Sequence, residues 1–251
     1  MCPVAAETMA LSSAIASDAG PSRAPAFVLR PGDDASALGS IASACADPVY
    51  ALAKRTTDLV CAAVLLVALL PVFALVGLAI VLESRGPVFY CAERIGRFGR
   101  PFCVAKFRSM RADADPEAHA AFIGSLLREE ARCAVYKVPD DPRITRVGAF
   151  LRRTSLDELP QLWNVLRGEM SLVGPRPDVP YAVAQYPDWV GPRLVVKPGI
   201  TGLWQVSGRS TLSLLDMYRL DVRYVQTASL LGDLRILVRT VPAVLSRTGA
   251  A

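Results

Sequence analysis

The densest polar stretch of this sequence is the segment RRTSLDELPQLWN, at residues 152–164. It places two adjacent carboxylates, Asp157 and Glu158, shortly after Arg152 and Arg153. A carboxylate can attack phosphorus, and a neighbouring carboxylate can bind Mg²⁺. Nearby cations keep carboxylates ionised and bind phosphate oxygens. The segment is therefore a candidate site for phosphoryl transfer, which needs positioning and charge neutralisation.

The same segment also has a purely structural interpretation. Ser155 followed three residues later by Glu158 matches a capping box, and acidic residues are favoured in a first helical turn. Pro160 instead favours Asp157 as the N-cap of a helix over about residues 157–166, because the proline then falls where no intrahelical donor is needed. Taken alone, the local pattern favours a structural cap over a catalytic pair.

Two further motifs carry cations that suit phosphate. In KFRSM, at residues 106–110, the side chains of Lys106 and Arg108 fall on the same side of a predicted strand. A solvated strand face is the alternative there. In GPRP, at residues 174–177, two prolines hold Arg176 on extended backbone. This arrangement suits a guanidinium aimed at phosphate as well as a rigid turn.

The charge-free run at residues 59–82 is the element most relevant to placing this site. About 20 apolar residues suffice to cross a bilayer, so the run is a membrane-helix candidate. Pro71 predicts a kink or break near its middle. The helix either crosses the bilayer with a kink or forms a re-entrant helix-break-helix that returns to the same face. Basic residues on both flanks, such as Lys54, Arg55 and Arg85, favour the re-entrant form with both ends in the cytoplasm.

The rest of the chain predicts a mostly helical α/β (α+β) fold. We expect a disordered tail at residues 1–48, a membrane-inserted segment at 49–85 and a catalytic domain on the cytoplasmic face at 86–251. Short strands are predicted at 87–90 and 102–107, separated by a turn at 96–100. Helices are predicted at about residues 113–134, 147–153, 157–166 and 230–245.

Composition excludes several classes of protein. The six cysteines form no CxxC pair, which argues against zinc, and a disulfide framework is not expected in a chain of this length. The single histidine, His119, leaves a Ser-His-Asp triad without support. Aromatic residues make up only 7% and the cations are scattered among carboxylates, so we expect no nucleic-acid binding.

Three segments taken together resemble the bacterial monotopic phosphoglycosyl transferases, also called undecaprenyl-phosphate sugar phosphotransferases. They are KFRSM at 106–110, DPRITRVGAFLRRTSLDELPQLWNVLRGEMSLVGPRP at 141–177 and KPGITGLWQVSGR at 197–209. The sequence DVRYV at 221–225 and the ending around 230–245 resemble the same family. The resemblance therefore covers nearly everything except the N-terminal tail.

The resemblance implies a reaction and a place for it. Asp157 would attack the sugar-proximal phosphate of a UDP-sugar and expel UMP, after which polyprenyl phosphate would take the phosphosugar from the aspartate. The product would initiate exopolysaccharide, capsule, O-antigen or glycoconjugate assembly at the inner membrane. The family fold is a small α/β domain with a re-entrant helix and amphipathic helices lying on the membrane, and its members can form homodimers.

The resemblance also implies roles for individual residues. Glu158 would be the partner that associates with Mg²⁺, with Asp157 as the second carboxylate of the metal site. Arg152 and Arg176 match phosphate-binding positions of the family. Two further candidate phosphate ligands are Lys106 and Arg108.

A non-catalytic, membrane-anchored module is the alternative reading. Such a module would bind acidic lipids or partner proteins through a basic surface, consistent with a net charge of +5. It does not explain why Asp157, Glu158, Arg152 and Arg176 stand at the positions where the family-like segments carry their functional residues. An enzyme with many transmembrane helices is disfavoured, because only one apolar segment is long enough.

Overall fold

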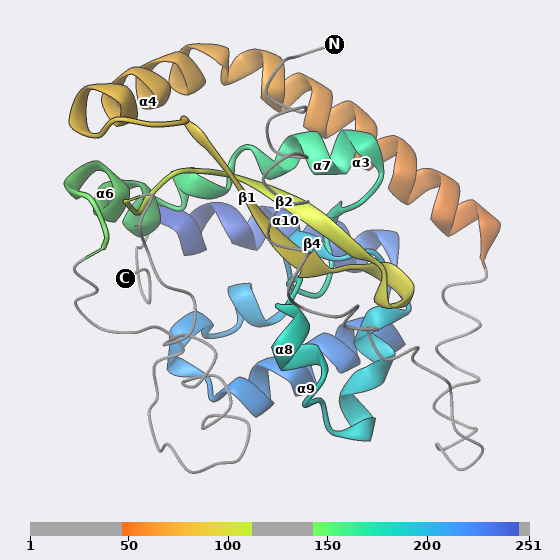
Figure 1. The fold of residues 1–251 in the computed structure, drawn as a ribbon. Helices are drawn as coiled ribbons and strands as arrows, with labels where there is room; N and C mark the ends of the chain where they lie inside the picture. The colour runs from red at the N-terminus through yellow and green to blue at the C-terminus, as the bar shows by residue number, and fades with distance from the viewer. Residues whose placement is uncertain (1–46, 112–142, 246–251) are drawn as a thin grey trace.

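The computed structural model describes residues 47–111 and 143–245 (Figure 1). The N-terminal tail up to residue 46, the predicted helix at 113–134 and His119 lie outside the described residues. The helices are α3 (Pro48–Ala68), α4 (Leu70–Glu83), α6 (Arg146–Thr154), α7 (Gln161–Arg167), α8 (Pro180–Val183), α9 (Leu214–Gln226) and α10 (Leu230–Leu245). The strands are β1 (Phe89–Ile95), β2 (Pro101–Phe107), β3 (Ser171–Val173) and β4 (Gly199–Thr201). The 3-10 turns in the described residues are η1 (Arg97–Gly99), η2 (Leu156–Glu158), η3 (Asp188–Leu194), η4 (Trp204–Val206) and η5 (Arg209–Thr211).

Helices α3 and α4 form a bent pair. Their axes differ by 59° across a break at Leu69, two residues before the predicted Pro71. Pro71 lies in the first turn of α4, where a missing N–H does not interrupt the helix. No single helix in the described ranges has the length and apolarity to cross a membrane by itself. The bent pair passes that test only when its two helices are taken together, by length and composition.

The first half of α3 packs against the rest of the domain. Lys54 donates to Asp233 of α10 at 2.8 Å, and Arg55 donates to the carbonyl of Val165 in α7 at 2.7 Å. Asp58 is buried and accepts the backbone N–H of Leu172 at 2.9 Å. Lys54 and Arg55, predicted as part of a basic membrane flank, also make contacts within the domain that hold α3 onto α7 and α10.

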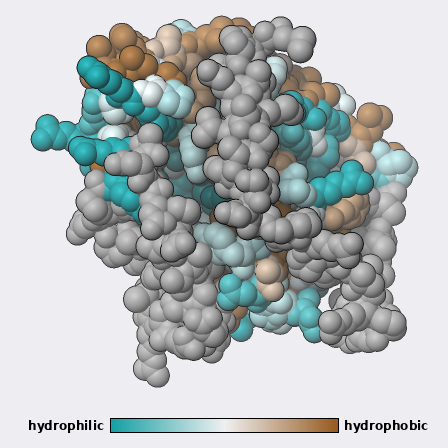
Figure 2. All heavy atoms as spheres, in the orientation of Figure 1, coloured by the Kyte–Doolittle hydropathy of each residue, from teal (hydrophilic) through white to brown (hydrophobic). Residues whose placement is uncertain are grey.

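The remainder of the bent pair exposes apolar side chains. Val64 of α3 is 61% exposed, and Leu75 and Leu82 of α4 are 68% and 77% exposed. Figure 2 shows these hydrophobic residues gathered along α3 and α4 at the upper edge of the molecule. Helix α10 is amphipathic as predicted, with Asp233 and Ile236 buried on one side and a stripe of exposed apolar residues on another: Leu231, Leu234, Val238 and Val241.

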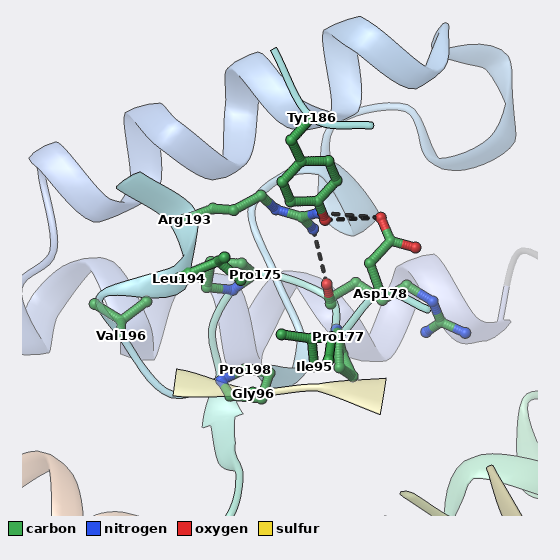
Figure 3. A pocket seen from close by; sticks show the side chains of 11 residues that line it. Ile95, Gly96, Pro175, Pro177, Asp178, Tyr186, Arg193, Leu194, Val196 and Pro198 are labelled. Carbon is green, nitrogen blue, oxygen red and sulfur yellow. Dashed lines mark hydrogen bonds and ion pairs between the residues drawn. The ribbon is translucent and has the colours of Figure 1, made fainter. Parts of the chain in front are cut away.

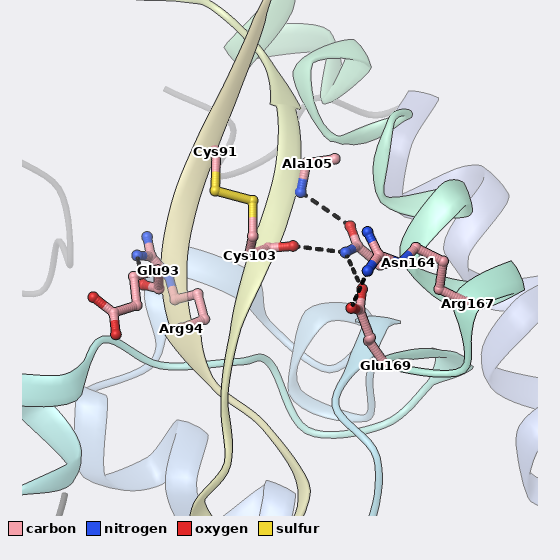
Figure 4. Close-up of a disulfide and its surroundings, with 8 residues drawn as sticks. All are labelled: Cys91, Glu93, Arg94, Cys103, Ala105, Asn164, Arg167 and Glu169. Atoms are coloured by element: carbon pink, nitrogen blue, oxygen red, sulfur yellow. Dashed lines mark hydrogen bonds and ion pairs between the residues drawn. A yellow bond between two sulfur atoms is a disulfide. The ribbon is translucent and has the colours of Figure 1, made fainter. Parts of the chain in front are cut away.

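Strands β1 and β2 form an antiparallel hairpin, which confirms the predicted strand at 102–107 and the turn at 96–100. The first strand was predicted at 87–90 and instead runs over Phe89–Ile95. The hairpin also contains a disulfide between Cys91 and Cys103 (Figure 4). The expectation of no disulfide framework did not anticipate this bond. The cysteines lie twelve positions apart in the sequence, and the strand pairing brings their Cα atoms to 5.4 Å.

A second, parallel sheet joins β3 to β4. Between this sheet, the hairpin and helices α3, α7, α9 and α10 lies the largest described core cluster, which includes Val104, Val165, Met170, Leu172 and Val225. The arrangement is a mixed helix and sheet fold that is mostly helical. This confirms the predicted fold class at that level.

Candidate active site

Asp157 and Glu158 lie in the short turn η2, between α6 and α7. Ser155 ends α6 in the left-handed conformation, with a φ of 59°, and makes no side-chain cap bond to the next turn. Pro160 then precedes α7 as its N-cap. The predicted helix start at Asp157 and the capping box are therefore wrong, because Ser155 interrupts the helical backbone. Both carboxylates sit on a turn fixed between two helices.

Three cationic hydrogen bonds hold Glu158. The Arg176 guanidinium donates to Oε1 at 2.5 Å and to Oε2 at 3.1 Å, and Lys106 Nζ donates to Oε1 at 3.0 Å. Burial disfavours the charged form of Glu158, but the charges and hydrogen bonds of Arg176 and Lys106 outweigh it and lower its pKa. Glu158 is consequently ionised across the physiological pH range.

Asp157 has the opposite electrostatic environment. Its side chain is buried, and burial followed by the neighbouring charge of Glu158 raises its pKa, although Lys106, Arg176 and Arg152 oppose this. No hydrogen bond from a described residue reaches its carboxylate. A weakly solvated carboxylate next to cations is suited to act as a nucleophile toward an anionic phosphate ester.

The structure places the predicted cations in two different locations. Lys106, Arg176 and Arg152 surround the carboxylate pair, and Arg152 Nε is oriented by Ser109 Oγ at 2.8 Å. Arg108 lies elsewhere: it is buried and donates to the carbonyls of Ser84 and Arg85 at 2.7 and 2.8 Å. Lys106 and Arg108 were predicted to share one face of a strand, but β2 ends at Phe107, before Arg108. In this structure Arg108 anchors the end of α4.

Arg209 is a further cation near the carboxylate pair and was not among the predicted phosphate ligands. Burial lowers the pKa of Arg209. The negative charge of Glu158 opposes this shift, and the positive charge of Arg176 adds to it. The Arg209 guanidinium therefore interacts electrostatically with both side chains. Arg209 also has a φ of 51°, an uncommon value for a residue with a side chain. Such backbone strain persists where surrounding structure imposes it, often at functional sites. The available signal was its position at the end of the family-like segment 197–209.

Asn164 positions Lys106 relative to Glu158 and was also missed. Its Oδ1 accepts the backbone N–H of Ala105 at 2.9 Å, and its Nδ2 donates to the carbonyl of Cys103 at 2.6 Å (Figure 4). Asn164 belongs to α7, whereas Lys106 follows Ala105 directly on β2. These two hydrogen bonds join the strand to the helix and so help to place Lys106 beside Glu158.

The site is also connected to the apolar helix pair. Glu83, the last residue of α4, accepts the backbone N–H groups of Arg146 and Val147 at 2.8 and 2.9 Å. These two residues begin α6, the helix that carries Arg152. Burial opposes ionisation of Glu83, but these hydrogen bonds outweigh it and lower its pKa. The carboxylate caps a helix N-terminus and so couples the position of α4 to that of α6.

The donor set fits Mg²⁺ only as a site shared with substrate. Within residues 47–111 and 143–245, no group of three or more His, Cys, Asp or Glu side chains is placed to hold a metal ion. Mg²⁺ at phosphate sites takes one or two carboxylates and completes its shell with water and substrate phosphates. Asp157 and Glu158 supply that number. Oε2 of Glu158 accepts from Arg176, and a carboxylate oxygen has a second lone pair for a cation.

A carboxylate pair beneath several cations, joined to a bent apolar helix pair, defines a class of site suited to binding and transferring phosphate groups. Comparison with known proteins identifies the family. Residues 49–247 match the family described as bacterial sugar transferase, and the chain belongs to this family. The prediction of a phosphoglycosyl transferase is confirmed.

Several relatives are similar over most of this chain. The exopolysaccharide production protein ExoY of Sinorhizobium fredii is 42% identical over 203 residues, which cover 81% of this chain and 90% of the relative. The undecaprenyl-phosphate galactose phosphotransferase of Salmonella typhimurium is 42% identical over 78% of this chain, and the match spans 41% of that longer protein. The UDP-glucose:undecaprenyl-phosphate glucose-1-phosphate transferase of Caulobacter vibrioides is 42% identical over 79% of this chain and 72% of its own length.

Proposed function

We propose that this chain transfers a sugar 1-phosphate from a UDP-sugar to undecaprenyl phosphate, or a similar polyprenyl phosphate, and so initiates assembly of an exopolysaccharide or related glycan. The names of the Salmonella and Caulobacter relatives support the lipid acceptor, and the latter supports a UDP-linked donor. The observation that carries the proposal is the buried Asp157 beside Glu158, whose charge is fixed by Arg176 and Lys106.

The reaction takes two displacements at one phosphorus atom. In the first, a carboxylate oxygen of Asp157 forms a bond to the sugar-bound phosphorus, and the bond to the UMP oxygen breaks with its electron pair on UMP. In the second, a phosphate oxygen of the polyprenyl acceptor attacks the same phosphorus and Asp157 leaves. No proton transfer is required at the nucleophile, because phosphate and carboxylate react as anions.

The described cations lower the cost of bringing anions together. Arg152, Arg176, Arg209 and Lys106 surround the position where the diphosphate must sit, and they neutralise its oxygens as charge moves to UMP. Mg²⁺ held by Glu158 and Asp157 would add a divalent charge against the same oxygens. The turn η2 fixes Asp157 so that the nucleophile does not have to be ordered during the reaction.

We also propose that α3 and α4 enter the membrane as a re-entrant pair. Both ends of the pair are attached to the same domain, through Lys54 and Asp233 at one end and through Glu83 and Arg146 at the other. A pair tethered in this way at both ends cannot place them on opposite sides of a bilayer. The exposed apolar stripe of α10 would lie on the same surface, with the domain on the cytoplasmic face of the inner membrane.

The reaction is tested by UMP release. Purified protein with Mg²⁺ and undecaprenyl phosphate is given a panel of UDP-sugars, one at a time. We expect acceptor-dependent UMP release with at least one donor. If folded, membrane-bound protein released no UMP with any donor of the panel, the result would instead favour a non-catalytic module that binds acidic lipids or partners.

The topology is tested by labelling in intact cells. Single cysteines replace Asp47 and Ser84, at the two ends of the bent pair, in a background without the native cysteines. A membrane-impermeant reagent should leave both positions unlabelled until the cells are opened. Labelling of one end alone in intact cells would establish a spanning helix.

A further inference from the structure

A small hollow of about 20 Å³, partly open to solvent, lies beside Arg176 on the side of α9 and has room for one water-sized group. Its lining combines an aromatic side chain, Trp204, with Met217 and a buried ion pair between Arg193 and Asp221. The proposed reaction uses Arg176, but it gives no role to the other polar groups in this hollow. These groups sit next to the phosphate-binding region without being part of it.

Asp221 is a buried carboxylate that, in the part of the chain that the structure describes, has a hydrogen-bond partner for only one of its two oxygens. Its side chain is 1% exposed, and Oδ2 accepts from Arg193 at 2.6 Å. Its other oxygen, Oδ1, has no hydrogen-bond partner among the described residues, and neither has Nε of Arg193. A buried polar atom without a partner costs free energy, so such atoms normally bind water or a ligand.

The charge network behind Asp221 is rigid and reaches Arg176. Arg193 donates to Asp178, to the hydroxyl of Tyr186 and, at 2.7 Å, to the backbone carbonyl of Arg176 (Figure 3). Arg193 is 4% exposed, and Asp178 is buried as well. The hollow is therefore a preformed site, in which an acceptor is held at a fixed position relative to the Arg176 backbone.

Arg176 connects the hollow to the carboxylate pair. Its guanidinium holds Glu158, and its charge also acts on Asp221, where it favours the ionised form. A donor whose diphosphate is bound by Arg176 must extend its ribose or its hexose past this residue. Both are rings that carry several hydroxyl groups, and a hydroxyl can donate to a carboxylate and accept from a guanidinium. Trp204 offers an apolar face at the same opening.

We propose that Asp221 binds a hydroxyl group of the donor through Oδ1, and that this contact contributes to donor specificity. The inference rests on the proposed function. The hydroxyl can belong to the ribose or to the hexose, which share this chemistry. A single bound water is the competing occupant, because a polar pocket of this kind can hold one.

Donors that lack one hydroxyl distinguish these cases. The preferred UDP-sugar is compared with its 2′-deoxyribose and 3′-deoxyribose analogues and with its single-deoxy hexose analogues, using wild-type protein and Asp221→Asn. We expect one deoxy donor to lower kcat/KM by about tenfold or more in the wild type, because a buried acceptor loses its partner. In Asp221→Asn, removing the same hydroxyl from the donor should lower kcat/KM by less than about threefold, because the interaction is already absent. A ribose analogue that shows this pattern identifies the nucleoside as the source, and a hexose analogue identifies the sugar.

One further variant is a matched control. Arg223→Gln, on the exposed side of α9, should retain the full discrimination of the wild type. Equal penalties for every deoxy donor in wild type and Asp221→Asn would overturn the inference, because Asp221 would then bind no donor hydroxyl. If the wild type released no UMP with any intact donor, the result would instead contradict the proposed function itself.

Discussion

The backbones of Gly174 and Gly199 are in direct contact. The N–H of Gly174 donates to the carbonyl of Thr201 at 2.9 Å, and the N–H of Gly199 donates to the carbonyl of Pro175 at 2.8 Å. A Cβ atom on Gly199 would collide with the backbone of Gly174, and one on Gly174 would lie 2.5 Å from the carbonyl of Lys197. This contact joins the GPRP and KPGITG segments, and so fixes the loop that carries Arg176.

We expect Gly199→Ala to lower the free energy of unfolding by about 1–3 kcal/mol, because backbone atoms that cannot move aside meet the new methyl group. Turnover should fall with it, since Arg176 follows the displaced strand. Thermal unfolding of purified protein measures the first effect. Gly77→Ala is the control, because its Cβ would make only an ordinary contact 3.5 Å from Val88. Equal thermal midpoints for Gly199→Ala and wild type would contradict the clash.

Asp157→Asn should separate catalysis from stability. We expect turnover to fall on the order of a thousandfold or more, because an amide cannot form the bond to phosphorus. Stability should be unchanged or higher, since burial already disfavours the charge of Asp157. UMP release and thermal unfolding are measured on the same preparation. Substantial turnover in the variant would exclude Asp157 as the nucleophile, and a large loss of stability would indicate a structural role.

Arg176→Lys should show that the site requires the paired N–H donors of a guanidinium, and that positive charge alone is not enough. Lysine keeps the positive charge but cannot donate to both oxygens of Glu158 in one plane. We expect kcat to fall by up to about a hundredfold, the lower end of the loss for one positioned donor, because lysine keeps the positive charge. Arg219→Lys is a matched control, because Arg219 makes an exposed ion pair on α9. An unchanged kcat in Arg176→Lys would mean that the bidentate contact is not used.

Removal of divalent metal should stop UMP release. Glu158 and Asp157 supply only two carboxylates, so we expect the metal to bind mainly together with the UDP-sugar and to be removed easily by a chelator. Turnover is measured in excess chelator and again after Mg²⁺ is restored. Continued full turnover in chelator would remove the metal role of Glu158 while leaving Asp157 as nucleophile.

Stability should decrease as pH rises from about 4 to about 7 through the titration of Asp221. Burial raises the pKa of Asp221 to about 7, although Arg193 opposes the shift, whereas an unfolded aspartate keeps the ordinary value of 3.8. Between these values the folded state binds more protons than the unfolded state, so the free energy of unfolding falls with pH and levels off above about 7.

Thermal midpoints at pH 5 and pH 7.5 measure this effect. Asp221→Asn does not titrate and should lose less stability than the wild type between these two values. Glu158 and Asp178, whose pKa values are lowered, titrate below this window and do not obscure the comparison. Identical changes in wild type and variant would show that the pKa of Asp221 lies outside the window.

Local signals in the sequence were enough for several elements. Alternating and helical patterns predicted the hairpin, α6 and α10, because side-chain periodicity depends only on neighbouring residues. They failed at Asp157, where the predicted helix start is a 3-10 turn. Ser155 ends α6 in the left-handed conformation, and nothing in a serine requires that conformation.

By itself, the sequence determined which groups could do chemistry and that one apolar segment precedes a mixed helix and sheet domain. It identified Asp157, Glu158 and Arg176 and the family to which they point. Tertiary structure alone decided which cations meet them: it brought Arg209 to the site across more than fifty positions and turned Arg108 away to the end of α4. The physical reason is that a charge acts through space, and distances between remote segments are set by how the core packs rather than by spacing along the chain.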